Sequence, residues 1–277
     1  MSRLKRLPLT GWLGLAIVAL VVLTAALSLA WTPYDPVHAV PEQRLLGSSA
    51  GHPMGTDRYG RDVLSRIMAG ARITLAVGVV AVGISALAGT VLGVWAGMAR
   101  GWPETLIMRG ADILLAFPAL LLAIVAGAAF GASTTTAMIA IGVAGVPGFA
   151  RVARAGTLQV MTQDYISAAR VSNVPGVLIA WRHVLPNIMG LLIVQSTVAF
   201  ALAVLAEAAL SFLGLGTAPP DPSWGRMLQS AQASLGTAPQ LAFWPGLAIA
   251  ATVLGFNLLG DGLRDVLDPR HSRRSRA

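Results

Sequence analysis

The residues that could carry enzymatic chemistry are few and scattered along the chain. Residues 47–51 (GSSAG) match the G-x-S-x-G pattern of hydrolase nucleophile elbows, and His52 follows them directly. That pattern indicates a catalytic serine only between a strand and a helix of an α/β sheet. Here it lies in a connection rich in glycine and serine, with no strand before it. We therefore interpret these residues as a linker.

Nucleotide and metal chemistry find equally little support in the sequence. A phosphate-binding loop of the Walker type needs a lysine that reaches the terminal phosphates, and the only lysine is Lys5, near the N-terminus. The chain has no cysteine, and its histidines are too scattered to form a metal-binding pair. We expect no catalytic residue, no metal site and no cofactor, so any ATP-driven work must come from a partner.

Three carboxylates stand out because they fall in or near apolar stretches: Asp112, Glu207 and Asp261. Ionisable groups inside a bilayer are costly, so they face the bundle interior, water or a partner. Arg109 lies one turn before Asp112 and Arg264 one turn after Asp261, so we expect an interfacial ion pair at each. Glu207 has no such neighbour, and we expect it to form hydrogen bonds across the bundle or to line a transport path.

The elements that must position these residues are membrane helices. Hydrophobic residues make up 55% of the 277 residues and charged residues only 12%, whereas a soluble domain carries about a quarter charged residues. Six stretches reach the roughly 20 apolar residues that cross a bilayer. They are residues 11–31, 73–98, 106–130, 134–152, 188–213 and 241–259, the last five within a core at 73–259. We expect an all-α integral membrane protein with six transmembrane helices.

The basic residues set the expected orientation of these helices. Most of the 20 lysines and arginines lie on one side, in the tails 1–10 and 260–277 and in alternate connections, so the positive-inside rule places both termini in the cytoplasm. The first stretch exceeds the h-region of a signal peptide, so we expect an uncleaved anchor. The net charge of +8 comes without basic runs interleaved with aromatic residues, so no nucleic-acid partner is expected.

The cytoplasmic connection at 153–187 is too long for a minimal turn. Within it, Asp164–Val171 reads as a short helix, and Asp164 is placed to cap it or to favour its positive end. Asn173 tolerates the left-handed conformation that ends helices, and Pro175 prevents continuation. Such a helix could dock into the cleft of another protein or lie on lipid headgroups.

Four blocks of sequence, in order along the chain, carry a family resemblance. They are residues 165–170 (YISAAR) with 181–187 (WRHVLPN), 52–57 (HPMGTD) with 60–66 (GRDVLSR), 210–216 (LSFLGLG) with 222–225 (PSWG), and 257–265 (NLLGDGLRD) with 268–270 (DPR). Together they resemble the permease subunits of ABC importers. More specifically, they are similar to the second permease of dipeptide, oligopeptide and nickel systems, and the first block is similar to the EAA loop of that family.

The resemblance implies a type I ABC importer permease fold in the inner (cytoplasmic) membrane of a bacterium. It implies three kinds of partner besides the lipid bilayer: a homologous second permease, two ABC ATPase subunits that hold ATP and Mg²⁺, and an extracytoplasmic substrate-binding protein. The expected function is the import of di- or oligopeptides. Import of nickel, a metal chelate or a glutathione-like compound is an alternative. An ion-coupled secondary transporter is an alternative of another class, although we see no inverted repeat of broken helices.

The resemblance also assigns site residues. The helix Asp164–Val171 is expected to sit in a groove of the ATPase, and residues 182–187 to stabilise the return into the next span. The residues expected to couple the two proteins are Asp164, Tyr165, Ile166, Ser167, Ala168, Ala169, Arg170, Asn173, Arg182, His183 and Pro186. Two of them depart from the family pattern: Ser167 stands where a glutamate is frequent and Asn173 where glycine is usual, so one charged docking contact is absent.

The outer connections, 32–72 and 214–240, carry two further expectations, and the second span carries one. Residues 62–72 place their apolar side chains on one helical face, so we expect an interfacial helix there. Trp224 is either a headgroup-level anchor or part of a contact with the substrate-binding protein. In the second span, Gly89, Gly93 and Gly97 are spaced for close helix packing within the bundle.

Overall fold

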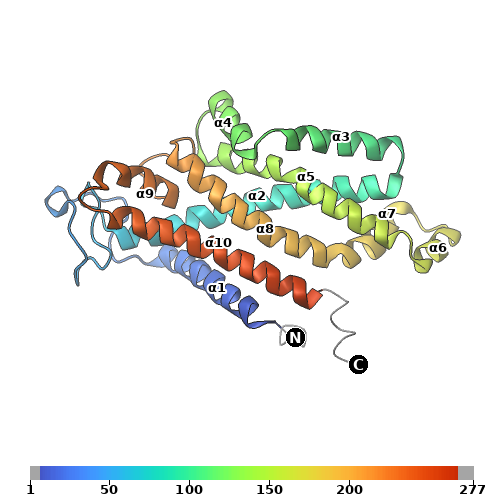
Figure 1. Cartoon of the computed structure of the whole chain (residues 1–277), viewed down its shortest axis with the longest axis horizontal. Coiled ribbons are helices and arrows are strands. Elements are labelled where there is room, and N and C mark those ends of the chain that lie inside the picture. Colours follow the sequence, from blue (N-terminus) through green and yellow to red (C-terminus); the bar gives the residue numbers. More distant parts are fainter. Residues whose placement is uncertain (1–6, 268–277) are drawn as a thin grey trace.

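The computed structural model describes residues 7–267 as a set of helices that run side by side (Figure 1). The long helices are α1 (Leu9–Ala30), α2 (Val63–Ala99), α5 (Thr134–Val160), α8 (Leu185–Phe212) and α10 (Gln240–Leu267). The shorter ones are α3 (Trp102–Ala116), α4 (Ala119–Phe130), α6 (Asp164–Val171), α7 (Gly176–Ile179), α9 (Trp224–Ala231), the 3₁₀ turns η2 (Pro41–Gln43) and η4 (Gln232–Ser234), and the π turn η3 (Ala180–Val184). The described part of the chain has no strand beyond one isolated bridge between Thr56 and Asp62. The all-α prediction is confirmed.

Five helices are long and apolar enough to cross a membrane, and a sixth crossing results if α3 and α4 count as one span. The stretch predicted as one span at 106–130 is broken in the structure, because α3 and α4 meet at 83°. The break lies at Phe117 and Pro118: Phe117 adopts an extended conformation, which the ring of a following proline favours. Pro147, by contrast, lies inside the continuous helix α5.

Several helices extend beyond the apolar stretches that revealed them. Helix α5 continues to Val160 and the helical path through α7, η3 and α8 begins at Gly176, so the predicted loop at 153–187 is mostly helical. Likewise, α2 is one helix from Val63 to Ala99, and the separate interfacial helix predicted at 62–72 is its first part. Hydropathy marks where the apolar environment ends, whereas a helix ends where its backbone hydrogen bonds are capped or broken.

Helices α2 and α5 make the most extensive contact in the bundle, and the glycines of α2 allow it. A Cβ atom at Gly89 would lie 2.5 Å from Cβ of Phe149, one at Gly97 would lie 2.7 Å from Cβ of Thr157, and one at Gly93 would collide with the carbonyl oxygen of Ala150. The hydroxyl of Ser85 also donates to the carbonyl of Gly142, across the interface, at 2.7 Å. The predicted packing role of these glycines is confirmed.

Helix α1 lies along α10 in a second glycine-mediated contact (Figure 1). Cβ atoms at Gly14, Gly255 and Gly262 would each meet the opposite helix within 3 Å. Helix α10 extends to Leu267, into the predicted tail at 260–277. The basic residues of the outermost tails lie outside the described residues.

Candidate coupling loop and buried polar residues

The short helix α6 projects at one end of the bundle, beyond the ends of α5 and α7, while α9 and the connection before α2 lie at the other end (Figure 1). Its bounds, Asp164–Val171, are those that the sequence predicted. Gln163 occupies the N-cap position without a side-chain hydrogen bond, so Asp164 acts in the first turn, where its charge favours the positive end of the helix.

The C-terminal end of α6 is closed by a Schellman motif centred on Asn173. This asparagine has a φ of 53°, in the left-handed region where asparagine is tolerated better than most residues. Its N–H donates to the carbonyl of Arg170 and the N–H of Val174 donates to that of Ala169, both at 3.0 Å. These two bonds are the pair that defines the motif, so asparagine performs here the turn for which glycine is usual.

One side chain fixes α6 to the bundle. Ile166 is 0% exposed and belongs to a cluster with Val160 and Met161 of the preceding segment and Ile179 and Val184 of the following one. Val160 is the last residue of α5 and Met161 is its C-cap, while Ile179 and Val184 lie on the path into α8, so Ile166 links α6 to two long helices at once. The sequence named Ile166 as a coupling residue, but its role as the anchor emerges only from packing.

The remaining surface of α6 faces outward. Asp164, Tyr165, Ser167, Ala168 and Arg170 are exposed. Ala169 is half-buried and packs against the cluster around Ile166. Of the two adjacent alanines, Ala168 is therefore the one available to a partner.

Three exposed apolar side chains extend this surface, and our coupling set did not include them. Val171 and Val177 are each 85% exposed and Trp181 is 71% exposed. Trp181 also lines an apolar groove of about 930 Å³ between α2 and the path into α8. Large apolar side chains that gather on an exposed surface mark contact sites. The apolar residues at the end of α6 and just after it are the feature of the sequence that could have identified this surface.

The return from α6 into α8 passes through the π turn η3. Pro186 lies in the first turn of α8, and a proline there removes one backbone N–H and crowds the carbonyl four residues earlier, which a wider turn relieves. The Asn187 side-chain amide donates to the carbonyl of His183 at 2.6 Å. His183 also packs its ring against Tyr165 of α6, at 5.9 Å between centroids. Arg182 is exposed beside them.

Two ion pairs join α3 to α5 near this end of the bundle. Asp112 accepts a hydrogen bond from Arg151 at 2.7 Å, and Glu104 accepts one from Arg154 at 2.6 Å. The predicted pairing of Asp112 with Arg109 is wrong, because the packing of α3 on α5 brings Arg151 closer. Asp261 is exposed, and no ion pair joins it to Arg264 among the described residues, so that expectation is also wrong.

Glu207 is buried near the outer end of α8, with 1% of its surface exposed. Its Oε1 accepts from the hydroxyl of Ser211, one turn later, at 2.7 Å, and that hydroxyl in turn accepts from the N–H of Thr217 at 3.0 Å. The second carboxylate oxygen, Oε2, is buried without a hydrogen-bond partner among the described residues, and the bond of Oε1 runs within α8. Glu207 thereby holds the start of the outer connection that leads to α9.

Trp224 is neither a headgroup anchor nor an exposed contact residue. It is 2% exposed, and its indole N–H donates to the carbonyl of Ile67 in α2 at 3.0 Å. A Cβ atom at Gly70 would lie 2.9 Å from the indole ring, so the small residue makes room for it. Both alternatives drawn from the sequence are corrected, because tertiary packing buries this side chain between α9 and α2.

The G-x-S-x-G run has no catalytic arrangement. The hydroxyl of Ser49 accepts from the main-chain N–H of His52 at 3.1 Å, whereas Nδ1 of the His52 ring lies 2.9 Å from Asp62. Asp62 is the N-cap of α2 and also accepts from the N–H of Ser65. These contacts shape the outer connection and fasten it to α2, as the linker interpretation expects.

Comparison with known proteins agrees with this architecture. Residues 89–273 match the family described as binding-protein-dependent transport system inner membrane component. The dipeptide transport system permease protein DppC of Alkalihalophilus pseudofirmus is 42% identical over 261 residues, which is 92% of this chain and 86% of that protein. The glutathione transport system permease protein GsiD of Pectobacterium atrosepticum is 43% identical over 239 residues, 86% of this chain and 79% of that protein.

A solved structure shares the fold. The inward-facing MetNI methionine ABC transporter contains a chain that superposes with a TM-score of 0.56 at 16% identity, covering 73% of this chain and 94% of that one. The extent of the sequence match, together with the helical bundle and its projecting loop, leads to one conclusion. This chain belongs to the family of binding-protein-dependent transport system inner membrane components, the multi-pass permease subunits of ABC importers.

Proposed function

We propose that this chain forms the translocation path of an importer for short peptides and that α6 is its contact with an ABC ATPase. The observation that carries the proposal is the construction of α6: one fully buried side chain, Ile166, fixes a helix whose other side chains are largely exposed. A helix that is anchored in the bundle on one face and exposed on the other is suited to transmit the movement of a bound partner to the bundle.

The route by which this movement would reach the bundle follows from the contacts of α6. Ile166 packs against Val160 and Met161 at the end of α5, and against Ile179 and Val184 on the way into α8. Helices α5 and α8 also contact each other and α2. Movement of α6 therefore reaches the bundle at two helices together, which would tilt them relative to the rest and switch access from one side of the membrane to the other.

The proposed orientation has six spans, with α3 and α4 as one bent crossing and both termini in the cytoplasm. The orientation rests on the basic residues of the whole sequence. The tails 1–10 and 260–277, together with the connections on the α6 side, hold 14 of the 20 lysines and arginines, and the positive-inside rule assigns such a side to the cytoplasm. The ATPases would then meet α6 on the side where ATP is available.

The proposed complex contains this chain, a homologous second permease, two ATPases that hold ATP and Mg²⁺, and an extracytoplasmic substrate-binding protein, in a bacterial inner membrane. The substrate class rests on the relatives, which are named for dipeptide and glutathione transport. Glutathione is itself a tripeptide, so both names indicate short peptides. A dipeptide and glutathione are accordingly the two substrates to compare first.

The coupling role can be tested by replacing Ala168 with glutamate. Ala168 is exposed on α6, so Ala168→Glu leaves the packing intact while it places a bulky charge on the docking surface. We expect uptake of a radiolabelled dipeptide and co-purification of the ATPase to fall to background, with the chain still in the membrane. Ala233→Glu is the matched control, because Ala233 is an exposed alanine at the opposite end.

Three outcomes would contradict parts of the proposal. Normal uptake and ATPase association in Ala168→Glu would remove the docking role of α6. Dipeptide uptake by the chain in vesicles without any ATPase would indicate a secondary transporter. If the complete complex takes up neither labelled dipeptide nor labelled glutathione but does take up a labelled non-peptide, the peptide assignment is removed and the coupling role stays in place.

A further inference from the structure

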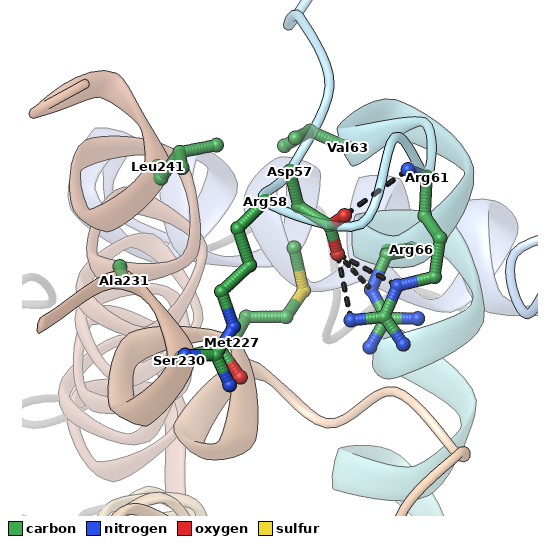
Figure 2. Close-up of a pocket in the computed structure, with 9 residues that line it drawn as sticks. All are labelled: Asp57, Arg58, Arg61, Val63, Arg66, Met227, Ser230, Ala231 and Leu241. Carbon is green, nitrogen blue, oxygen red and sulfur yellow. Dashed lines mark hydrogen bonds and ion pairs between the residues drawn. The ribbon is translucent and has the colours of Figure 1, made fainter. Parts of the chain in front are cut away.

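A small polar cavity lies at the end of the bundle opposite α6, where the connection before α2 meets α2, α9 and α10 (Figure 2). Its charged lining consists of Arg58, Arg61 and Arg66 together with a single acid, Asp57. Apart from Ser230 of α9, the rest of the lining is apolar. Nothing in the coupling role of α6 involves these residues.

The carboxylate of Asp57 is already fully engaged. Its Oδ2 accepts from Nε of Arg61 at 2.7 Å and lies 3.8 Å from Nε of Arg66 (Figure 2). Its Oδ1 accepts from the main-chain N–H groups of Tyr59 at 2.8 Å and Arg61 at 3.0 Å. Asp57 therefore balances one of the three arginines and has little capacity left for a second.

The cavity is left with more positive than negative charge in a poorly hydrated place. The side chain of Arg66 is 4% exposed and that of Arg61 is 11% exposed. Arg66 donates from NH1 to the carbonyl of Pro36 at 2.6 Å, which is a neutral acceptor and cancels no charge. Because buried charges are normally paired, the buried guanidinium of Arg66, which shares the cavity with the half-exposed Arg58, calls for a counter-ion.

Arg58 supplies a second, independent observation. Its guanidinium lies over the ring of Tyr59, 4.7 Å from the centroid, and donates from NH2 to the Tyr59 hydroxyl at 2.7 Å. Its Nε is buried and has no hydrogen-bond partner among the described residues. Figure 2 shows this side chain extending away from Asp57 toward Ser230 and Met227 of α9. A buried donor without an acceptor is destabilising, so an acceptor belongs here.

The volume of the cavity limits which hydrogen-bond acceptor can occupy it. Its volume of about 20 Å³ exceeds the roughly 10–15 Å³ needed for one water molecule, and a peptide or a lipid headgroup is far larger. A water molecule would satisfy Nε of Arg58 but would leave the surplus charge. We propose that the cavity binds one chloride ion, held by Arg58, Arg61 and Arg66 with the hydroxyl of Ser230. The ion would fasten the outer connection to α2 and α9.

Thermal unfolding of the full-length chain, purified with its associated subunits, tests the proposal. Sodium chloride is compared with sodium gluconate at equal ionic strength, because gluconate is too large for the cavity. Binding to the folded state alone raises Tm, and we expect a rise of a few degrees in chloride. Arg58→Gln should lose most of this rise. Arg72→Gln should keep it, because Arg72 carries the same charge on α2 but does not line the cavity.

Bromide gives a readout that needs no variant. Crystals of the wild-type complex grown in bromide should show an anomalous peak among the three guanidinium groups. The proposal is overturned if that peak is missing, or if the wild-type Tm is the same in chloride and gluconate. An equal chloride effect in wild type and Arg58→Gln would also overturn it, because the stabilising ion would then bind elsewhere.

Discussion

The anchoring role of Ile166 leads to the sharpest prediction. Its side chain is 0% exposed, and Ile→Ala changes at such sites cost roughly 2–5 kcal/mol, whereas Ile→Val costs about 0.5–1.5. Helix α6 has only 8 residues, and isolated helices shorter than about 12–15 residues are marginal in water. The short helix therefore cannot compensate for the loss, and we expect Ile166→Ala to release α6 from α5 and α8.

The absence of cysteine from the chain makes this release measurable. A single cysteine introduced at the exposed Ser167 can carry a spin label that reports the mobility of α6. In Ile166→Ala we expect the label to become mobile and dipeptide uptake to fall at least tenfold, with normal amounts of the chain in the membrane. Ile166→Val should stay within about fivefold of wild type, since its smaller cost is about 1 kcal/mol.

Val171→Ala is the matched control, because Val171 belongs to the same helix but is 85% exposed. It should leave the mobility of the label unchanged, whatever its effect on docking. Wild-type mobility and uptake in Ile166→Ala would refute the reasoning, since α6 would then be held by something other than this side chain.

Two further predictions concern buried or strained positions. Glu207→Gln keeps an oxygen that can accept from Ser211, so stability and uptake should remain close to wild type. Glu207→Ala leaves the O–H donor of Ser211 without its carboxylate acceptor, although the hydroxyl still accepts from Thr217, at a cost of about 1–3 kcal/mol. We expect a lower Tm in detergent, and equal Tm values for the two variants would contradict the hydrogen-bond role. At Asn173, where φ is 53°, Asn173→Gly should be neutral or slightly stabilising, whereas Asn173→Val should cost about 1–2 kcal/mol and lower uptake. Uptake equal to wild type in Asn173→Val would contradict the importance of this left-handed turn.

Local signals explain where the sequence predicted the structure well. The bounds of α6 followed from Asn173 and Pro175, whose backbone preferences act within a few residues. The glycines of α2 indicated a close helix contact because their spacing places them on one face. The bent pair α3–α4 was missed, although Pro118 was visible in the sequence. Hydropathy averages over about 20 residues and does not register a change of direction within them.

Side-chain partners separated by many residues followed different rules. Arg109 was expected to pair with Asp112 because it lies one turn away, yet Arg151 forms the bond from another helix at 2.7 Å. Trp224 is of a residue type that often anchors helices at the membrane interface, yet it is buried against Gly70 and Ile67. In both cases, the packing of two distant segments decided the outcome, and a single sequence carries no direct record of such contacts.

The sequence by itself determined that the chain is a helical membrane protein, because the length of an apolar stretch and the capping of a helix depend only on residues that are neighbours in the sequence. Its motifs also indicated the importer family. The tertiary structure decided which side chains of the coupling loop serve as anchor and which as surface. Ile166 and Ala168 are two residues apart, and only the meeting of α5, α6 and α8 buries the first and exposes the second. The arginines around Asp57 are neighbours in the sequence, but the cavity that they line exists only because the fold packs residues 57–66 against α9 and α10.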